Sequence, residues 1–202
     1  MKQQGAETRY HQSFSWGDEG QFLMATLHAT PHEGLVEARR QPGVQIVGGD
    51  PLIAGSAVAI ESSRKTIEWA MDTIEDGRRI EFVAQHKQKS DLMGGVALAR
   101  YEDDINGPAR VSLSFWRTSE VDVRTMADMC QAAIMFTSKK TTFGAGITDA
   151  ELRIPSSDHP SQRVAVELGA RTTGQLFFNG IEMQNNPARA AYHKWSVKVG
   201  EA

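Results

Sequence analysis

Only one cysteine, Cys130, occurs among the 202 residues of this chain. A single thiol excludes an intramolecular disulfide, so nothing in the sequence requires maturation in an oxidising compartment. Apolar runs are also short, and all of them fall well below the roughly 20 residues that cross a bilayer. The first residues, MKQQG, lead into a polar stretch, which is not typical of a secretory signal. We therefore expect a cytoplasmic protein that does not insert into membranes.

Charge of one sign is equally scarce. The formal net charge is -3, and the basic residues gather only in isolated pairs. Because nucleic-acid binders usually carry a basic stripe or patch, we expect no nucleic-acid partner. The histidines lack the spacing of metal ligands: His28 and His32 are one helical turn apart, but Pro31 breaks the helix that would bring them together. The sequence therefore predicts no metal site.

What the chain does contain is typical of one globular domain, which we take to span residues 1–202. Its first 60 residues are the least regular part. We expect a strand within 7–16 and then a short helix, because Phe22, Leu23, Thr26 and Leu27 stand at helical spacing. Residues 31–61 are rich in glycine and proline, which predicts a long loop with one short strand at 44–47.

From residue 62 onward the patterns are clearer. A capped helix is expected over 62–77, where apolar residues repeat with the helical period and a glycine follows. Period-two patterns and turn signals predict an antiparallel meander. The remaining elements are a long helix, a strand, a short helix and two strands. The expected strands are 79–85, 92–101, 110–116, 150–154, 173–178 and 190–199, and the helices are 118–138 and 161–168.

These elements predict an α/β fold with one mixed, mostly antiparallel central sheet and helices on both faces. The apolar side of each element predicts a shared core. Its expected members are Leu113, Phe115, Ile134, Phe136, Val164 and Leu168.

One late segment resembles a known motif. Residues 154–170 read IPSSDHPSQRVAVELGA. This is similar to a segment of the GNAT superfamily of N-acetyltransferases, in which Asn-x-x-Ser-x-Arg-Val opens a short helix that closes in Leu-Gly-Phe. Asp158 stands at the Asn position and Ala170 at the Phe position. Residues 92–98 and 113–116 resemble two earlier strands of the family, and the ribosomal-protein acetyltransferases are the most similar subgroup. The resemblance is good over 62–199 and divergent over 1–60.

The resemblance implies a GNAT-like fold in which two central strands splay and hold the acyl thioester of acetyl-CoA between them. The backbone at the end of one strand would orient the acyl carbonyl, and the start of the long helix would meet the pyrophosphate. The cofactor-binding residues implied in this way are Phe115, Trp116, Arg117 and Thr118 for the carbonyl, Arg124, Thr125, Met126 and Ala127 for the pyrophosphate, and Ser161 in the late motif.

The chain departs from the family where the chemistry is concentrated. The family's phosphate loop reads Arg/Gln-x-x-Gly-x-Gly/Ala, but Thr125 replaces a glycine, and Asp122 brings a negative charge that would repel a pyrophosphate. Serines stand at positions 112 and 114, where many members carry a carboxylate base, and Ala165 stands where many carry a tyrosine acid. The catalytic residues are therefore unknown.

Two functions are compatible with this sequence. The first is a divergent acyl-CoA-dependent N-acyltransferase, with acetyl-CoA as cofactor and an amine of a protein or small molecule as acceptor. The alternative is a non-catalytic GNAT-like domain that acts as a binding or structural assembly module, such as a viral structural component or an adaptor, with protein partners. Both leave a homo-oligomer open.

Overall fold

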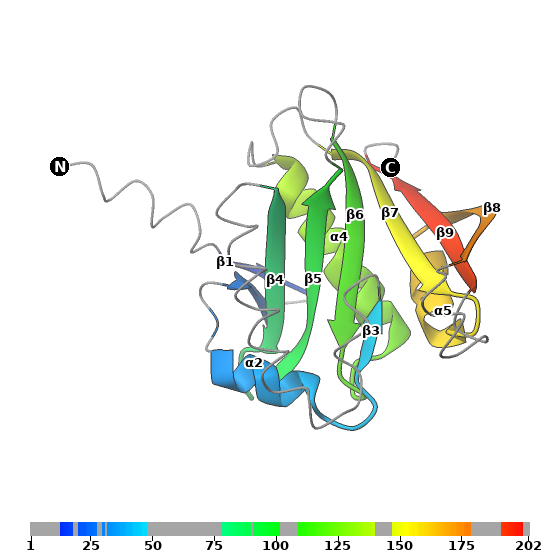
Figure 1. The fold of residues 1–202 in the computed structure, drawn as a ribbon. Coiled ribbons are helices and arrows are strands. Elements are labelled where there is room, and N and C mark those ends of the chain that lie inside the picture. Colours follow the sequence, from blue (N-terminus) through cyan, green and yellow to red (C-terminus); the bar gives the residue numbers. More distant parts are fainter. Residues whose placement is uncertain are drawn as a thin grey trace.

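The computed structural model describes residues 13–17, 20–27, 30, 32–47, 78–89, 91–101, 109–139, 147–178 and 191–199. Nine strands and three helices lie in these parts of the chain (Figure 1). The strands are β1 (Ser13–Trp16), β2 (Phe22–Thr26), β3 (Gln45–Val47), β4 (Arg79–His86), β5 (Leu92–Arg100), β6 (Ala109–Arg117), β7 (Ile147–Pro155), β8 (Arg171–Phe178) and β9 (Ala191–Lys198). The helices are α2 (His32–Arg39), α4 (Val123–Lys139) and α5 (His159–Glu167).

The strands form one sheet in the order β1-β2-β4-β5-β6-β7-β9-β8, and β3 pairs with β6 outside this path. All the pairs are antiparallel except β6 with β7, which is parallel. The parallel pair needs a crossover, and α4 supplies it because this helix lies between the two strands in sequence. The mostly antiparallel sheet and the β4-β5-β6 meander confirm the prediction from period-two patterns.

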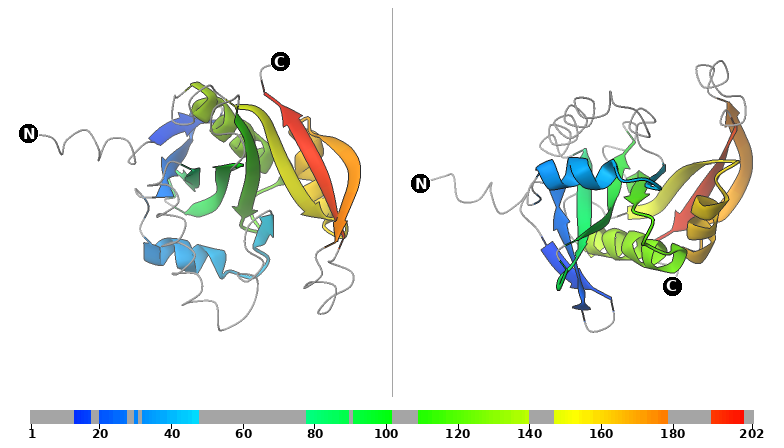
Figure 2. Two further views of the ribbon diagram at one scale, coloured as in Figure 1. Left: turned by 45° about the horizontal axis from the view of Figure 1, so that its top comes forward. Right: turned by 90° about the horizontal axis from the view of Figure 1, so that it is seen from below.

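Helices cover both faces of the sheet, as the element order predicts. α2 lies on one face, whereas α4 and α5 lie together on the other (Figures 1 and 2). α4 and α5 also pack against each other. The side chains of α4 and those of one face of the central strands form the main core.

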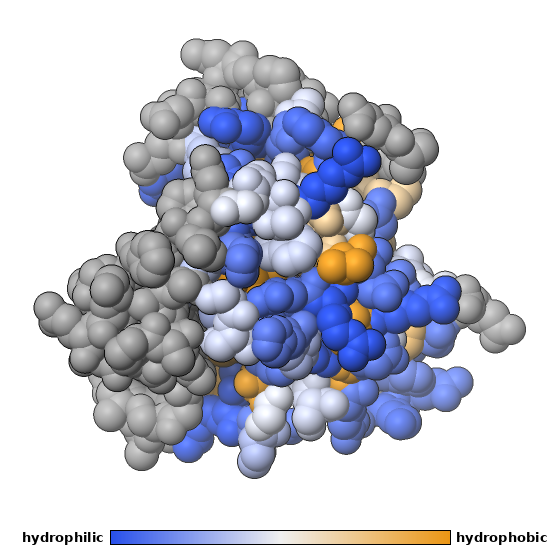
Figure 3. Space-filling model, turned by 90° about the vertical axis from the view of Figure 1, so that its right-hand side faces the viewer, coloured by the Kyte–Doolittle hydropathy of each residue, from blue (hydrophilic) through white to orange (hydrophobic). Residues whose placement is uncertain are grey.

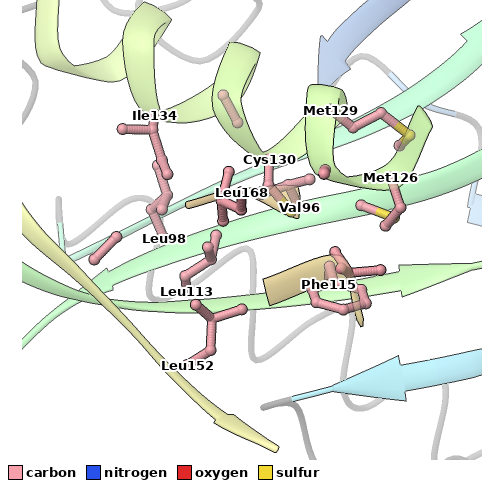
Figure 4. Packing of buried hydrophobic residues seen from close by; sticks show 14 of the residues in the cluster. Val96, Leu98, Leu113, Phe115, Met126, Met129, Cys130, Ile134, Leu152 and Leu168 are labelled. Atoms are coloured by element: carbon pink, nitrogen blue, oxygen red, sulfur yellow. The ribbon is translucent and has the colours of Figure 1, made fainter. Parts of the chain in front are cut away.

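The main core includes the residues expected from the sequence. Leu113, Phe115, Ile134, Val164 and Leu168 all belong to one buried cluster, and Phe136 packs against it while partly exposed. Figure 4 shows Met126 of α4 reaching toward Phe115 of β6. Two aromatic contacts extend the cluster to β1, since Phe14 stacks on Phe136 with ring centroids 4.3 Å apart and meets Phe82 edge-on.

A second buried cluster fixes α2 to the opposite face. It consists of Leu27, Leu35, Val36, Ala38, Val83 and Trp116. An ion-pair group adjoins it, in which Glu81 of β4 accepts hydrogen bonds from Arg39 at 2.5 Å and from Arg79 at 2.8 Å. Arg39 also lies over the Trp116 ring, 5.2 Å from its centroid. Both apolar packing and charge pairing therefore hold this helix.

Gly95 provides the space for the Trp116 indole. A Cβ added at Gly95 would lie 2.3 Å from Trp116 Nε1 and 2.9 Å from the carbonyl oxygen of Phe82. The glycine in the middle of β5 is therefore a packing requirement, because any side chain there would displace the indole that α2 covers.

The N-terminal part differs from the prediction at several points. Phe22–Thr26 is a strand instead of a helix, because it lies between β1 and β4 and pairs with both. The segment expected to be a loop contains α2, and its short strand begins at Gln45. The long helix starts at Val123, five residues later than expected. The helix expected over 62–77 lies outside the described residues.

Candidate functional site

The expected site lies where β6 and β7 separate. Their parallel pairing begins at Ala109 with Ile147 and ends at Ser112 with Glu151. Beyond this point the two ribbons diverge (Figures 1 and 2). The splay that the sequence resemblance implies is therefore present, and the backbone of Phe115–Arg117 lies on its β6 side.

β3 occupies the β6 side of this divergence. Gln45, Ile46 and Val47 pair antiparallel with Arg117, Trp116 and Phe115. A strand has only two hydrogen-bonding edges, and β5 pairs with the other edge of β6 over this same stretch. β3 therefore lies on the edge that faces β7, which it also approaches. Both edges of the β6 end are paired within the chain.

Arg117 ties β3 to the start of α4. Its guanidinium donates from Nη2 to Gln45 Oε1 at 2.6 Å and from Nη1 to the carbonyl oxygen of Val121. The side chain is buried, and this burial lowers the pKa of the guanidinium, although the nearby carboxylates of Asp158 and Asp122 partly offset the shift. Arg117 thus holds a positive charge inside the site and balances it with carboxylates of the chain itself.

The start of α4 carries its own anion. Asp122 Oδ1 accepts the backbone N–H of Thr125 at 2.8 Å, and Oδ2 accepts the Thr125 hydroxyl at 3.1 Å. The hydrogen bond from the Thr125 backbone is the main reason that the pKa of the Asp122 carboxyl lies below its usual value. Aspartate is a favoured N-cap because it satisfies an N–H group that the helix leaves open. In this chain a side-chain carboxylate is bound where the resemblance implies a pyrophosphate.

The other residues implied for cofactor binding have other contacts or lie in the core. Met126 and Ala127 are buried in the main core, and the backbone N–H of Thr118 donates to the carbonyl oxygen of Met93 at 2.9 Å. Arg124 is exposed at the helix start. Ser161 is fully buried in the first turn of α5, and its hydroxyl has no hydrogen-bond partner in the described part of the chain. The structure brings β6 and the α4 start together, but their polar donors largely bind the chain itself.

A polar group that the sequence did not reveal lies on the α2 face of the sheet. Tyr101 donates its hydroxyl to Glu151 Oε2 at 2.9 Å, and Lys194 pairs with the other carboxylate oxygen. Burial and then the hydrogen bond and charge of Glu151 raise the pKa of Tyr101. Glu151 is opposite Ser112, three residues before Phe115, which is about 10 Å along a strand. The group joins the end of β5 to β7 and β9, and it lies beside Ser112, one of the two strand positions where the resemblance implies a base.

The described residues contain no cluster of three or more His, Cys, Asp or Glu side chains that could bind a metal ion. None of the helices found in the same ranges is both long and apolar enough to span a membrane.

No protein-family model matches the chain, and none of the curated proteins compared with it is similar at the level of sequence. Solved structures are similar in fold. An acetyltransferase from Salmonella typhimurium that modifies the N-terminal serine of a 50S ribosomal subunit protein matches with a TM-score of 0.62 and 12% identity, over 89% of this chain and 95% of that one. A GNAT-family acetyltransferase from Bacillus anthracis matches with a TM-score of 0.61 and 12% sequence identity, over 92% of this chain and 98% of that one.

A third similar structure was solved with ligands. The microcin C7 self-immunity acetyltransferase MccE, in complex with acetyl-CoA and AMP, matches with a TM-score of 0.57 and 12% identity, over 87% of this chain and 92% of that one. At these identities the comparisons show the fold alone: this chain has the fold of the GNAT acetyltransferases. They carry no residue roles to it.

Acetyl-CoA is the cofactor that the sequence resemblance implies, and the residues present do not fit it in this arrangement. The strand edge expected to face the thioester is paired with β3. The helix start expected to face the pyrophosphate binds the carboxylate of Asp122. Both halves of the implied cofactor site are therefore filled by the chain.

Proposed function

We propose that this chain is a non-catalytic GNAT-fold domain that acts as a binding or assembly module. The observation that carries the proposal is the pairing of β3 with Phe115–Arg117, the stretch of β6 that would orient an acyl carbonyl in an enzyme. A backbone that already pairs on both edges has few donors left for an oxyanion, and such donors are a main source of catalysis in acyl transfer.

The electrostatics of the helix start support the same proposal. Asp122 is ionised at neutral pH, because its pKa lies below the ordinary value of 3.8. A second anion at this helix start would meet that negative charge and would compete for the N–H of Thr125. Serines stand at the two strand positions where the sequence resemblance implies a carboxylate base.

We infer the kind of partner from the character of the surface. In Figure 3, hydrophilic residues cover most of the described surface of one side, and the hydrophobic areas are small and separate. Among the described residues, the large hydrophobic side chains that are exposed are Met135 and Val166. On this proposal the partners are proteins bound through mainly polar contacts, a second copy of the chain included, and nucleic acid is not a partner.

Calorimetric titration with acetyl-CoA tests the proposal. We expect no saturable binding heat at millimolar acetyl-CoA. We also expect mass spectrometry to detect no acetyl transfer to amine acceptors. Arg124→Glu is the matched variant, because Arg124 is the exposed cation at the start of α4. Saturable binding by the natural chain that Arg124→Glu abolishes would show a working cofactor site and overturn the proposal.

A divergent acyl-CoA-dependent N-acyltransferase is the second candidate. The fold favours it, because solved structures that match over most of this chain are acetyltransferases and one of them holds acetyl-CoA. This candidate requires β3 to leave the β6 edge during turnover. Acetyl transfer by the natural chain to a protein or small-molecule amine would establish it.

A further inference from the structure

A group of positively charged side chains lies on the sheet to one side of α2. This helix packs on β4, β5 and the end of β6, and β7, β9 and β8 continue the sheet beyond it (Figures 1 and 2). Residues that pair directly across two strands point to the same face, and every second residue along a strand returns to that face. The cations that share the α2 face by this register are Arg110, Arg153, Arg171, Lys194 and Lys198, which we call the basic face.

Contacts around Tyr101 agree with this register. The Arg110 guanidinium lies over the Tyr101 ring, 6.0 Å from its centroid. Burial is the main cause that raises the pKa of Tyr101, and the positive charge of Arg153 opposes part of this rise. Lys194 pairs with Glu151, the carboxylate that accepts the Tyr101 hydroxyl. Cations from β6, β7 and β9 therefore meet around one tyrosine and one carboxylate.

Like charges are placed opposite one another within the basic face. Arg153 of β7 is the direct partner of Lys194 of β9. Arg171 of β8 is opposite Ser196, two residues along β9 from Lys194, so it adds a third positive charge diagonally across the strands. Like charges directly opposite on neighbouring strands destabilise a sheet. The chain thus gathers cations here at a cost in stability, although its net charge is -3.

The carboxylates of this region lie deeper than the cations. The side chains of Asp149 and Glu151 are 16% and 10% exposed, whereas the side chain of Lys198, which pairs with Asp149, is 63% exposed. Arg153 and Arg171 are exposed as well. A molecule that approaches from solvent therefore meets positive charge first, with the two carboxylates beneath it.

The size of the basic face selects among anionic partners. Asp149 and Arg153 are four residues apart on β7, about 13 Å, and β6 is about 14 Å from β8 across three strand spacings. About four residues of an extended peptide span such a distance. A nucleic acid needs a longer basic stripe, and a long polyanion would extend onto the remainder of a chain in which acidic residues outnumber basic ones. A short run of carboxylates on a protein fits both the size and the charge.

We propose that the basic face is a docking surface for an acidic segment of a partner protein, whose carboxylates bind Arg153, Arg171 and Lys194. The inference deepens the proposed function, on which it rests, because it gives the chemistry of the partner that the binding module takes. Guanidinium groups suit this role, since their planar donors match a carboxylate.

Calorimetric titration with an N-acetylated octaglutamate peptide tests the inference. Arg153→Gln/Arg171→Gln removes two exposed cations of the basic face. Arg124→Gln/Arg163→Gln is the matched control, because it makes the same change of charge at exposed positions of α4 and α5, on the opposite face of the sheet. Arg153→Lys/Arg171→Lys keeps the charge and reads the contribution of the planar guanidinium groups.

We expect the natural chain and the matched control to bind octaglutamate saturably and with similar affinity. Arg153→Gln/Arg171→Gln should bind about tenfold more weakly, because an exposed ion pair contributes up to a factor of about five. Arg153→Lys/Arg171→Lys should lose less than the glutamine variant. Binding by the natural chain should weaken as salt rises from about 0.05 to 0.5 M, because salt screens exposed charges.

An equal loss of binding in the two glutamine variants would overturn the inference, as would no binding of octaglutamate at millimolar peptide. Tighter binding of a decauridylate RNA than of octaglutamate would overturn it in favour of nucleic acid. Sedimentation that shows self-association of the natural chain, abolished in Arg153→Gln/Arg171→Gln, would overturn it in favour of a second copy. Binding or turnover of acetyl-CoA would instead contradict the proposed function, so the two failures are read from different ligands.

Discussion

Replacing Glu81 with glutamine removes the charge that holds α2 on the sheet. Glu81 is 2% exposed, and its carboxylate receives hydrogen bonds from Arg39 and Arg79. Burial alone would raise the pKa of Glu81, but the two guanidinium groups outweigh it and the pKa lies below its ordinary value. Glutamine keeps the shape and leaves two arginines facing a neutral amide.

The expected loss of folding stability is large. Removing one partner of a buried ion pair costs about 3–5 kcal/mol, because the remaining charge is left without compensation. For a domain of roughly 150–250 residues, 1 kcal/mol shifts the melting temperature by about 2–4 °C. Glu81→Gln should therefore lower the melting temperature by about 6–20 °C at neutral pH.

Calorimetry or circular dichroism measures this shift. Glu33→Gln is the matched control, since Glu33 lies in the first turn of α2 with its side chain exposed, and it should melt close to the natural protein. The difference between Glu81→Gln and the natural protein should shrink as the pH falls below the ordinary value of 4.5, because stabilisation by a depressed carboxyl pKa is lost on protonation. A Glu81→Gln protein that melts within about 2 °C of the natural one would refute the reasoning.

Three further outcomes follow. Phe115→Ala should cost about 3–5 kcal/mol of unfolding free energy in denaturant titration, whereas Val166→Ala, at an exposed position, should change it little; equal effects would show that the core is misassigned. Cys130 should not react with Ellman's reagent until the protein unfolds, because burial raises the pKa of its thiol; rapid reaction in the native state would contradict this. Glu151→Gln should lower the pKa of Tyr101 in an ultraviolet titration, because the carboxylate contributes to raising it; an unchanged titration would show that the two groups do not interact.

The sequence predicted the central sheet because its strands carry their pattern locally. In β6 the apolar residues alternate with serines, and the alternation alone gives both the element and its buried face. The late motif gave the fold family for a similar reason. Asp158 caps α5 in the structure through the N–H of Ser161, and the helix begins at His159, two residues before its expected start.

The features that the sequence did not predict depend on contacts between residues that are distant in the chain. Phe22–Thr26 has apolar residues at spacings that suit a helix or a strand, and its place between two other strands decides the outcome. Gly34 lies inside α2 and weakens the local sequence signal for a helix. The second buried cluster and the ion pairs of Glu81 stabilise this helix instead. No local pattern could show that Gln45–Val47 pairs with β6 or that Asp122 caps α4 in place of binding phosphate.

The pairing of β3 also bears on the order in which the protein folds. Gln45 and Arg117 are 72 residues apart in sequence, so β3 docks only after a long segment of chain has closed and β6 has formed. Only three residue pairs of β3 with β6 offset that loss of entropy. The meander of β4, β5 and β6 has shorter connections and more residue pairs between neighbouring strands. We therefore expect β3 to dock late in folding and to detach before the rest of the sheet opens.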